Sequence, residues 1–128
     1  MKTGLVLEGG AKRGIYTAGV LDIFLEHGIR FDGVIGVSAG AIHGCSFVSE
    51  QIGRSIRYNL EYGSDYRFMS LRSWLLSGNV VDTKFCYHDL PERLDRYDYE
   101  TFKKSSTAFY VTCSNVETGK PEYFRCLD

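Results

Sequence analysis

The stretch DGVIGVSAGAIHG, residues 32–44, decides how the fold is interpreted. Its first half is a short apolar run typical of a buried strand, and its second half is a run of small residues typical of a packed helix. Ser38 lies between Gly36 and Gly40, at the point where the strand becomes the helix. So tight a turn forces the serine into a strained backbone conformation that lifts its hydroxyl clear of the sheet, and the small flanking residues keep strand and helix from colliding.

A second glycine-rich turn comes earlier in the chain, at Gly9-Gly10-Ala11-Lys12-Arg13-Gly14. The apolar pattern around the two turns predicts four elements, namely strands over 3–7 and 34–37 and helices over 14–27 and 39–49. Gly28 follows the first helix and suits a left-handed C-cap. The order strand, helix, strand, helix predicts an α/β fold with parallel strands and right-handed crossovers.

The second half of the chain is less regular. Its patterns predict helices over 54–63 and 83–94 and a strand pair over 107–114 and 122–126. Asp82 or Thr83 suits the N-cap of the second of these helices. Residues 117–120 offer the turn of the strand pair, which we interpret as a hairpin. Without a repeat or a linker, one domain is the simplest count.

The loop over residues 9–14 has four interpretations. A phosphate-binding P-loop would need Lys and Ser or Thr after its last glycine, but Ile15 and Tyr16 follow Gly14. A dinucleotide fingerprint would need glycine at position 11 and an acid at the end of the second strand, whereas Asp32 precedes that strand. The loop is then an oxyanion hole built from backbone N–H groups, or only a tight turn. Adjacent parallel strands would bring it beside Ser38, which is the geometry of acyl transfer and favours the oxyanion hole.

Composition excludes several classes of function. The 128 residues carry 15 Lys and Arg against 16 Asp and Glu, a net charge of -1, which gives no field for a nucleic-acid partner. No apolar run approaches the roughly 20 residues of a membrane span, and the N-terminus does not have the pattern of a signal peptide, so a cytoplasmic location is expected. Four cysteines without a close pair and three isolated histidines predict neither a metal site nor a cofactor.

At these residues the sequence resembles the patatin-like phospholipase family, which opens with a strand, a G-G-G-x-R/K-G oxyanion loop and a helix, followed by a strand that carries G-x-S-x-G. Residues 8–14 match that loop except at Ala11, and residues 36–40 match the second motif throughout. The late stretch FYVTCSNVETGKPEYF, residues 109–124, also resembles the family. The resemblance therefore covers nearly all of the chain.

The resemblance implies a three-layer α/β/α fold with a mainly parallel central sheet, incomplete at the C-terminus. It also implies hydrolysis of lipid acyl esters by a Ser–Asp dyad that uses no metal and no cofactor. Ser38 would be the nucleophile. The backbone N–H groups of the loop would hold the oxyanion, drawn from Gly9, Gly10, Ala11, Lys12, Arg13 and Gly14. Ala11 keeps its N–H, so the hole survives unless this position needs a positive φ.

The family's general base is the Asp of a D-G-G/A motif that follows the strand pair. The only Asp-Gly here is Asp32-Gly33, at the end of the strand opposite Ser38. We therefore expect residues 1–128 to be the N-terminal portion of a single patatin-like domain, truncated before that Asp. Such a chain would be nearly inert, while the full-length protein hydrolyses esters. Truncation would also expose a sheet edge and apolar surface, which a homodimer would cover.

Other features stay open at this stage. The side chain of Arg13 either braces the loop or joins a surface salt bridge. His43 is expected to be a helix-face or a hydrogen-bonded histidine rather than a partner of Ser38. Residues 66–76, YRFMSLRSWLL, are interpreted as a middle helix packed onto the sheet, the alternative being peripheral contact with a membrane or a cap over an acyl pocket. The alternative functions are a phosphate- or nucleotide-binding module and a regulatory family member without activity.

Overall fold

The fold is known from a computed structural model that describes residues 1–68 and 70–126. The chain divides into two compact units. The first comprises residues 1–55 and 98–128, and the second comprises residues 56–97.

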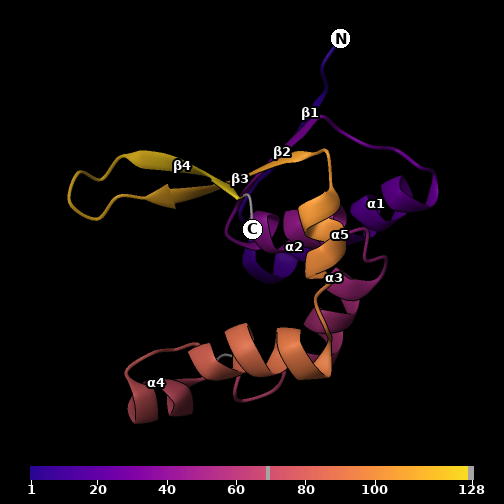
Figure 1. The fold of residues 1–128 in the computed structure, drawn as a ribbon. Helices are drawn as coiled ribbons and strands as arrows, with labels where there is room; N and C mark the ends of the chain where they lie inside the picture. The colour runs from indigo at the N-terminus through magenta and orange to yellow at the C-terminus, as the bar shows by residue number, and fades with distance from the viewer. Residues whose placement is uncertain (69, 127–128) are drawn as a thin grey trace. The chain divides into compact units, whose positions relative to one another are not determined.

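A four-stranded sheet in the order β1-β2-β3-β4 forms the centre of the first unit (Figure 1). Its strands are β1 Gly4–Leu7, β2 Gly33–Val37, β3 Ala108–Ser114 and β4 Pro121–Cys126. β1 pairs with β2 and β2 with β3 in parallel, whereas β3 and β4 are antiparallel. This confirms the α/β fold with a mainly parallel sheet and the hairpin at its end. Gly119 takes a φ of 68° in the hairpin turn.

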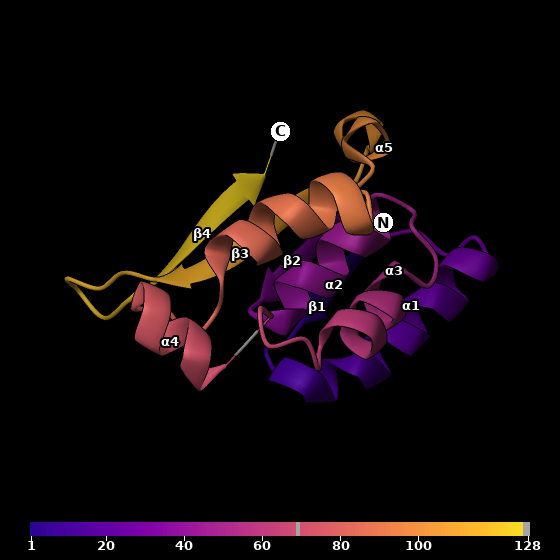
Figure 2. The same cartoon turned by 90° about the horizontal axis from the view of Figure 1, so that it is seen from below.

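The helices of this unit are the short 3₁₀ turn η1 Ala11–Gly14, then α1 Ile15–Glu26, α2 Ala39–Val48 and α5 Tyr99–Lys104. Gly28 takes a φ of 68° just after α1, which confirms the left-handed C-cap. Helices α1 and α2 pack on one face of the sheet (Figure 2). Their side chains and the inward side chains of the strands form one core, made of Leu7, Leu21, Leu25, Val34, Phe47, Val48 and Phe109. Helix α5 adds Phe102, whose ring packs edge-on against that of Phe109 with the two ring centroids 5.9 Å apart.

The opposite face of the sheet carries the alternate residues of each strand, because successive side chains of a strand point to opposite faces. Val6, Ile35 and Tyr110 occupy one row across three strands, and Tyr123 lies beside them on β4. Val6 is 78% exposed and Tyr123 is 62% exposed. Among the described residues of this unit, helices therefore cover only one face of the sheet.

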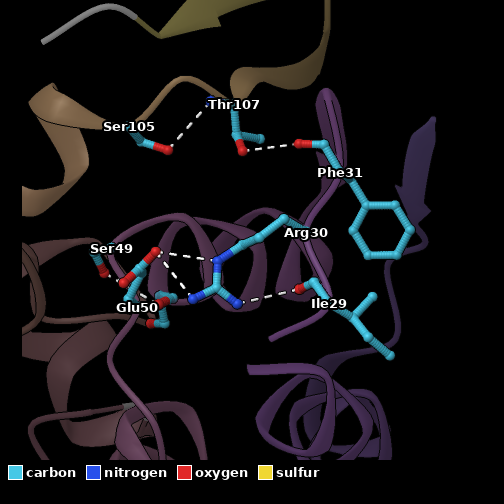
Figure 3. A network of polar contacts seen from close by, with 8 residues as sticks. Ile29, Arg30, Phe31, Ser49, Glu50, Ser105 and Thr107 are labelled. Carbon is cyan, nitrogen blue, oxygen red and sulfur yellow. Dashed lines mark hydrogen bonds and ion pairs between the residues drawn. The ribbon is translucent and has the colours of Figure 1, made fainter. Parts of the chain in front are cut away.

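The amino ends of the strands are joined by side-chain hydrogen bonds (Figure 3). The guanidinium of Arg30 donates to Glu50 Oε1 from Nε and forms an ion pair with it at 3.1 Å. The hydroxyl of Thr107 donates to the carbonyl of Phe31 at 2.8 Å, which ties the start of β3 to the start of β2. The backbone N–H of Thr3 donates to Asp32 Oδ2 at 2.6 Å, which ties β1 to β2 in the same way.

The second unit is helical, with α3 Arg54–Arg57 at its boundary followed by the π-helix η2 Tyr58–Tyr62, α4 Leu71–Ser77 and the π-helix η3 Phe85–Leu94. Phe85 and Leu90 are fully buried. Arg57 forms an ion pair with the buried Asp95 at 2.8 Å. Residues 83 and 84 form a helical turn that leads into η3, and Asp82 Oδ1, just before this turn, accepts the N–H of Phe85 as expected of an N-cap.

Residues 66–76 belong to the second unit, so their expected packing onto the sheet stays a prediction. The helical part of this stretch is α4, in which Leu71 is 76%, Trp74 52% and Leu75 76% exposed. Met69 and the side chain of Leu76 lie outside the described residues. Contact of this stretch with a membrane stays a prediction.

Candidate active site

Ser38 occupies the single position between β2, which ends at Val37, and α2, which begins at Ala39. Its backbone has φ 51° and ψ -122°, a conformation that non-glycine residues rarely adopt, and its side chain is exposed. The strained, outward-facing serine expected from the sequence is therefore present. A Cβ on Gly36 would lie 2.6 Å from the backbone N of Ala41, which explains why glycine is needed there.

The glycine loop folds into η1 directly after β1. The backbone N–H of Arg13 donates to the carbonyl of Gly10 at 3.0 Å, which closes the turn. Ala11 has a φ of 46°. The position that departs from the family's glycine thus requires a positive φ, and alanine occupies it under strain.

Parallel pairing of β1 with β2 brings the loop and the serine together, as predicted. Leu7 is in register with Gly36, so both strands end at the same edge of the sheet. A Cβ on Gly9 would lie 3.2 Å from the Cβ of Ser38. A Cβ on Gly40 would lie 2.6 Å from the carbonyl oxygen of Glu8 and would also meet that of Leu7. The two turns are in backbone contact, and glycine is what allows it.

The charged side chains of the loop, Lys12 and Arg13, are both exposed. Within residues 1–68 and 70–126, the guanidinium of Arg13 neither braces the loop by a hydrogen bond nor joins a salt bridge, so the described residues support neither expectation for it. The loop meets the Ser38 turn through its backbone at Gly9 and not through these side chains.

Asp32 lies at the amino end of β2, opposite Ser38. Its carboxylate accepts hydrogen bonds from the backbone N–H of Thr3 and from the Thr3 hydroxyl at 3.1 Å. These bonds favour the charged form and hold the pKa of Asp32 below its usual range. This carboxylate fastens two strands together. In the part of the chain that the structure describes, no side chain is hydrogen-bonded to the hydroxyl of Ser38.

His43 lies on α2 and faces the glycine loop. It is 98% buried, being only 2% exposed, and neither of its ring nitrogens forms a hydrogen bond with the described residues. Its Nε2 lies 2.7 Å from the place that a Cβ on Gly14 would occupy. Burial lowers the pKa of His43, while the charge of Asp22 partly opposes this shift. Of the two forms expected for His43, the structure has the helix-face form and not the hydrogen-bonded one, and the ring is not paired with Ser38. Sequence reasoning missed its contact with the loop.

This geometry can be set beside known proteins. The family model described as patatin-like phospholipase matches residues 5–126. The chain belongs to the patatin-like phospholipase family. It is a family of lipid hydrolases, and both turns of the candidate site lie inside the matched residues.

Curated relatives agree with this membership. The chain is 30% identical over 128 residues to the uncharacterized protein YjjU of Escherichia coli strain K12, an alignment that covers 96% of this chain and 35% of YjjU. It is 28% identical over 130 residues to the lysophospholipase nte1 of Aspergillus terreus, with 94% of this chain and 8% of the relative covered. It is 32% identical over 87 residues to the lysophospholipase NTE1 of Eremothecium gossypii, an alignment that covers 64% of this chain and 6% of the relative. The chain spans about a third of YjjU and under a tenth of the fungal proteins.

Two further observations concern membranes and metals. Over residues 1–68 and 70–126, each helix is too short or too polar to cross a bilayer. The same residues contain no group of three or more His, Cys, Asp or Glu side chains placed to hold a metal ion. The cytoplasmic location stays a prediction.

Proposed function

We propose that the protein is a serine acyl hydrolase that cleaves lipid esters, with Ser38 as its nucleophile. The observation that carries this proposal is the contact between the two turns, in which the Cβ of Ser38 lies 3.2 Å from the Cβ position of Gly9. A strained, exposed serine beside a loop of backbone N–H donors is the arrangement that acyl transfer needs. Membership of the patatin-like phospholipase family supports a lipid ester as the substrate.

The reaction proceeds in two steps. The hydroxyl oxygen of Ser38 attacks the ester carbonyl and gives its proton to a general base. N–H groups of the glycine loop, other than that of Arg13, which is bonded to Gly10, stabilise the negative oxygen that forms. The carbon–oxygen bond to the alcohol then breaks, the alcohol takes the proton, and an acyl-enzyme remains. Water attacks this ester in the second step and releases the fatty acid.

We further propose that the general base is an Asp that lies outside residues 1–128. Asp32 cannot take this role because its carboxylate is bound to Thr3 at the other end of the strand. Loss of one member of a catalytic pair or triad slows hydrolases by roughly 10⁴–10⁶-fold. The 128-residue chain is thus expected to turn over very slowly, and a longer form that carries the Asp is expected to be active.

A fluorophosphonate probe tests the assignment of the nucleophile. We expect slow labelling of Ser38 in the 128-residue chain, faster labelling when formate or acetate is added as a substitute base, and none in Ser38→Ala. Peptide mapping by mass spectrometry identifies the labelled residue. Labelling of another residue, or equal labelling of Ser38→Ala, would contradict the proposal. Tight binding of a nucleotide without labelling would favour a phosphate-binding module. The absence of both labelling and nucleotide binding would favour a regulatory member of the family.

A further inference from the structure

His43 is the buried titratable group that the proposed reaction does not use. It lies on α2, one turn after Ala39, and its ring reaches the glycine loop instead of Ser38. Nε2 lies 2.7 Å and Cδ2 lies 3.1 Å from the Cβ position of Gly14, and the Cβ of Ala39 lies 3.2 Å from the same point. The imidazole therefore fills the space between helix α2 and Gly14, the last residue of the loop.

Three close approaches join the two turns. Gly9 meets Ser38, Gly40 meets the carbonyls of Leu7 and Glu8, and Gly14 meets His43. The first two are contacts of the backbone or of a Cβ atom, and they fix the start of the loop. The third is made by a ring, and it supports the far end of the loop, after the strained Ala11.

We propose that His43 is a positioning residue for the loop over residues 9–14. Its ring, packed beneath Gly14, sets the separation between the backbone N–H groups of the loop and the hydroxyl of Ser38. The inference rests on the proposed role of this loop in the reaction. It makes His43 a support of the oxyanion site and not a partner of the serine.

The charge of the ring matters for this support. The charged groups on the neighbouring elements are Lys12 and Arg13 on η1 and Asp22 and Glu26 on α1. Asp22 acts on the ring electrostatically, and its Oδ1 is already held by the backbone N–H of Gly53 at 3.0 Å. Because burial lowers the pKa of His43, the ring is neutral at pH 7, and protonation would place a charge in an enclosed space beside the loop.

Native-state trypsin digestion of the 128-residue chain tests the positioning role, because Lys12 and Arg13 lie in the loop. We expect His43→Ala to raise the rate of cleavage after these residues about tenfold, since the last turn loses its support. His43→Leu fills the same space and is expected to restore slow cleavage. Val48→Ala is the matched control, because it removes buried volume from the same helix on its core side. Equal acceleration by Val48→Ala, or none by His43→Ala, would overturn the proposal.

A second readout follows the ring itself. In NMR spectra recorded against pH, we expect the amide signals of Ala11 and Gly14 to shift with the midpoint of the His43 ring, below the ordinary histidine pKa of about 6.5. His43→Leu should abolish that midpoint. Amide signals that stay constant while His43 titrates would overturn the proposal. Both readouts report the loop without hydrolysis, so failure of Ser38 labelling affects only the proposed function.

Discussion

The two ends of the parallel strands are built on different principles. At the carboxyl end, the glycine loop and the Ser38 turn meet through backbone and small side chains, with separations that leave no room for a Cβ on Gly40. At the amino end, the strands are tied by side-chain hydrogen bonds, such as those from Thr3 to Asp32 and from Thr107 to Phe31. The carboxyl end depends on the absence of side chains, and the amino end depends on their presence.

Backbone strain follows the same division. The described residues include three non-glycine residues with positive φ, namely Ala11, Ser38 and Glu50, and the first two lie at the carboxyl end. Strain of this kind persists only where the surrounding structure holds it, and it gathers at functional sites. The comparison teaches that the carboxyl end is held by steric fit, which tolerates little change, while the amino end has bonds that can be lost singly.

The largest effect on the free energy of unfolding is expected for Gly40→Ala. The new Cβ would lie 2.6 Å from the Glu8 carbonyl and would collide with that of Leu7, and neither backbone can move without disturbing β1. We expect a loss of about 3 kcal/mol or more in the free energy of unfolding, measured by urea denaturation. Gly19→Ala is the control. No atom lies within 4 Å of its Cβ position on α1, so it should stabilise the chain by about 0.5–1 kcal/mol. Similar losses for both variants would show that the carboxyl end is not sterically tight.

A smaller effect of opposite sign is expected for Ala11→Gly. The φ of 46° strains an alanine but suits a glycine, although glycine also gains freedom in the unfolded chain. The net result should be a gain of about 0.5–1 kcal/mol in the free energy of unfolding. Thermal unfolding followed by circular dichroism measures it, and Ala18→Gly, inside α1 and without positive φ, should be destabilising instead. A loss of stability in Ala11→Gly would mean that the loop is not strained at this position.

The smallest effect is expected at the amino end, for Arg30→Gln. The ion pair with Glu50 is 3.1 Å long, but the side chains are 44% and 52% exposed, so water screens it. We expect a loss of at most about 0.5 kcal/mol, which high salt should reduce further. A double-mutant cycle with Glu50→Gln in urea isolates the pair. A coupling as large as the loss in Gly40→Ala would remove the distinction between the two ends.

The sequence was enough to predict those features of the fold and the site in which the backbone geometry requires one particular type of residue. Glycines flanking a serine between a strand and a helix can be recognised because few other residues fit there, and parallel pairing then places both turns at one edge. The Asp82 N-cap and the hairpin were predictable for similar local reasons. These signals lie within a few neighbouring residues, so no knowledge of the tertiary structure is needed to see them.

Other features depend on residues that are distant in the chain. Burial of His43 requires Gly14 opposite it, and neither residue signals the other in the sequence. Alanine is a good helix former, so Ala11 does not itself indicate a positive φ, and the signal for one was the glycine that the resembled family has at this position. Helix α5 is short, and its cap, in which Asp98 accepts the N–H of Thr101, was not foreseen. Helix α4 exposes Leu71, Trp74 and Leu75, although a cluster of large apolar residues in a sequence usually indicates burial.

The path of the chain between its two units has a consequence for how such proteins diverge. The first unit is interrupted after Ser55 and resumes at Asp98, whose backbone N–H bonds to the side chain of Gln51 at 3.0 Å. The described residues between them, 56–68 and 70–97, contribute no strand to the sheet. The first unit is left and re-entered at neighbouring points, so a change in the length of residues 56–97 would not by itself alter the register of the sheet.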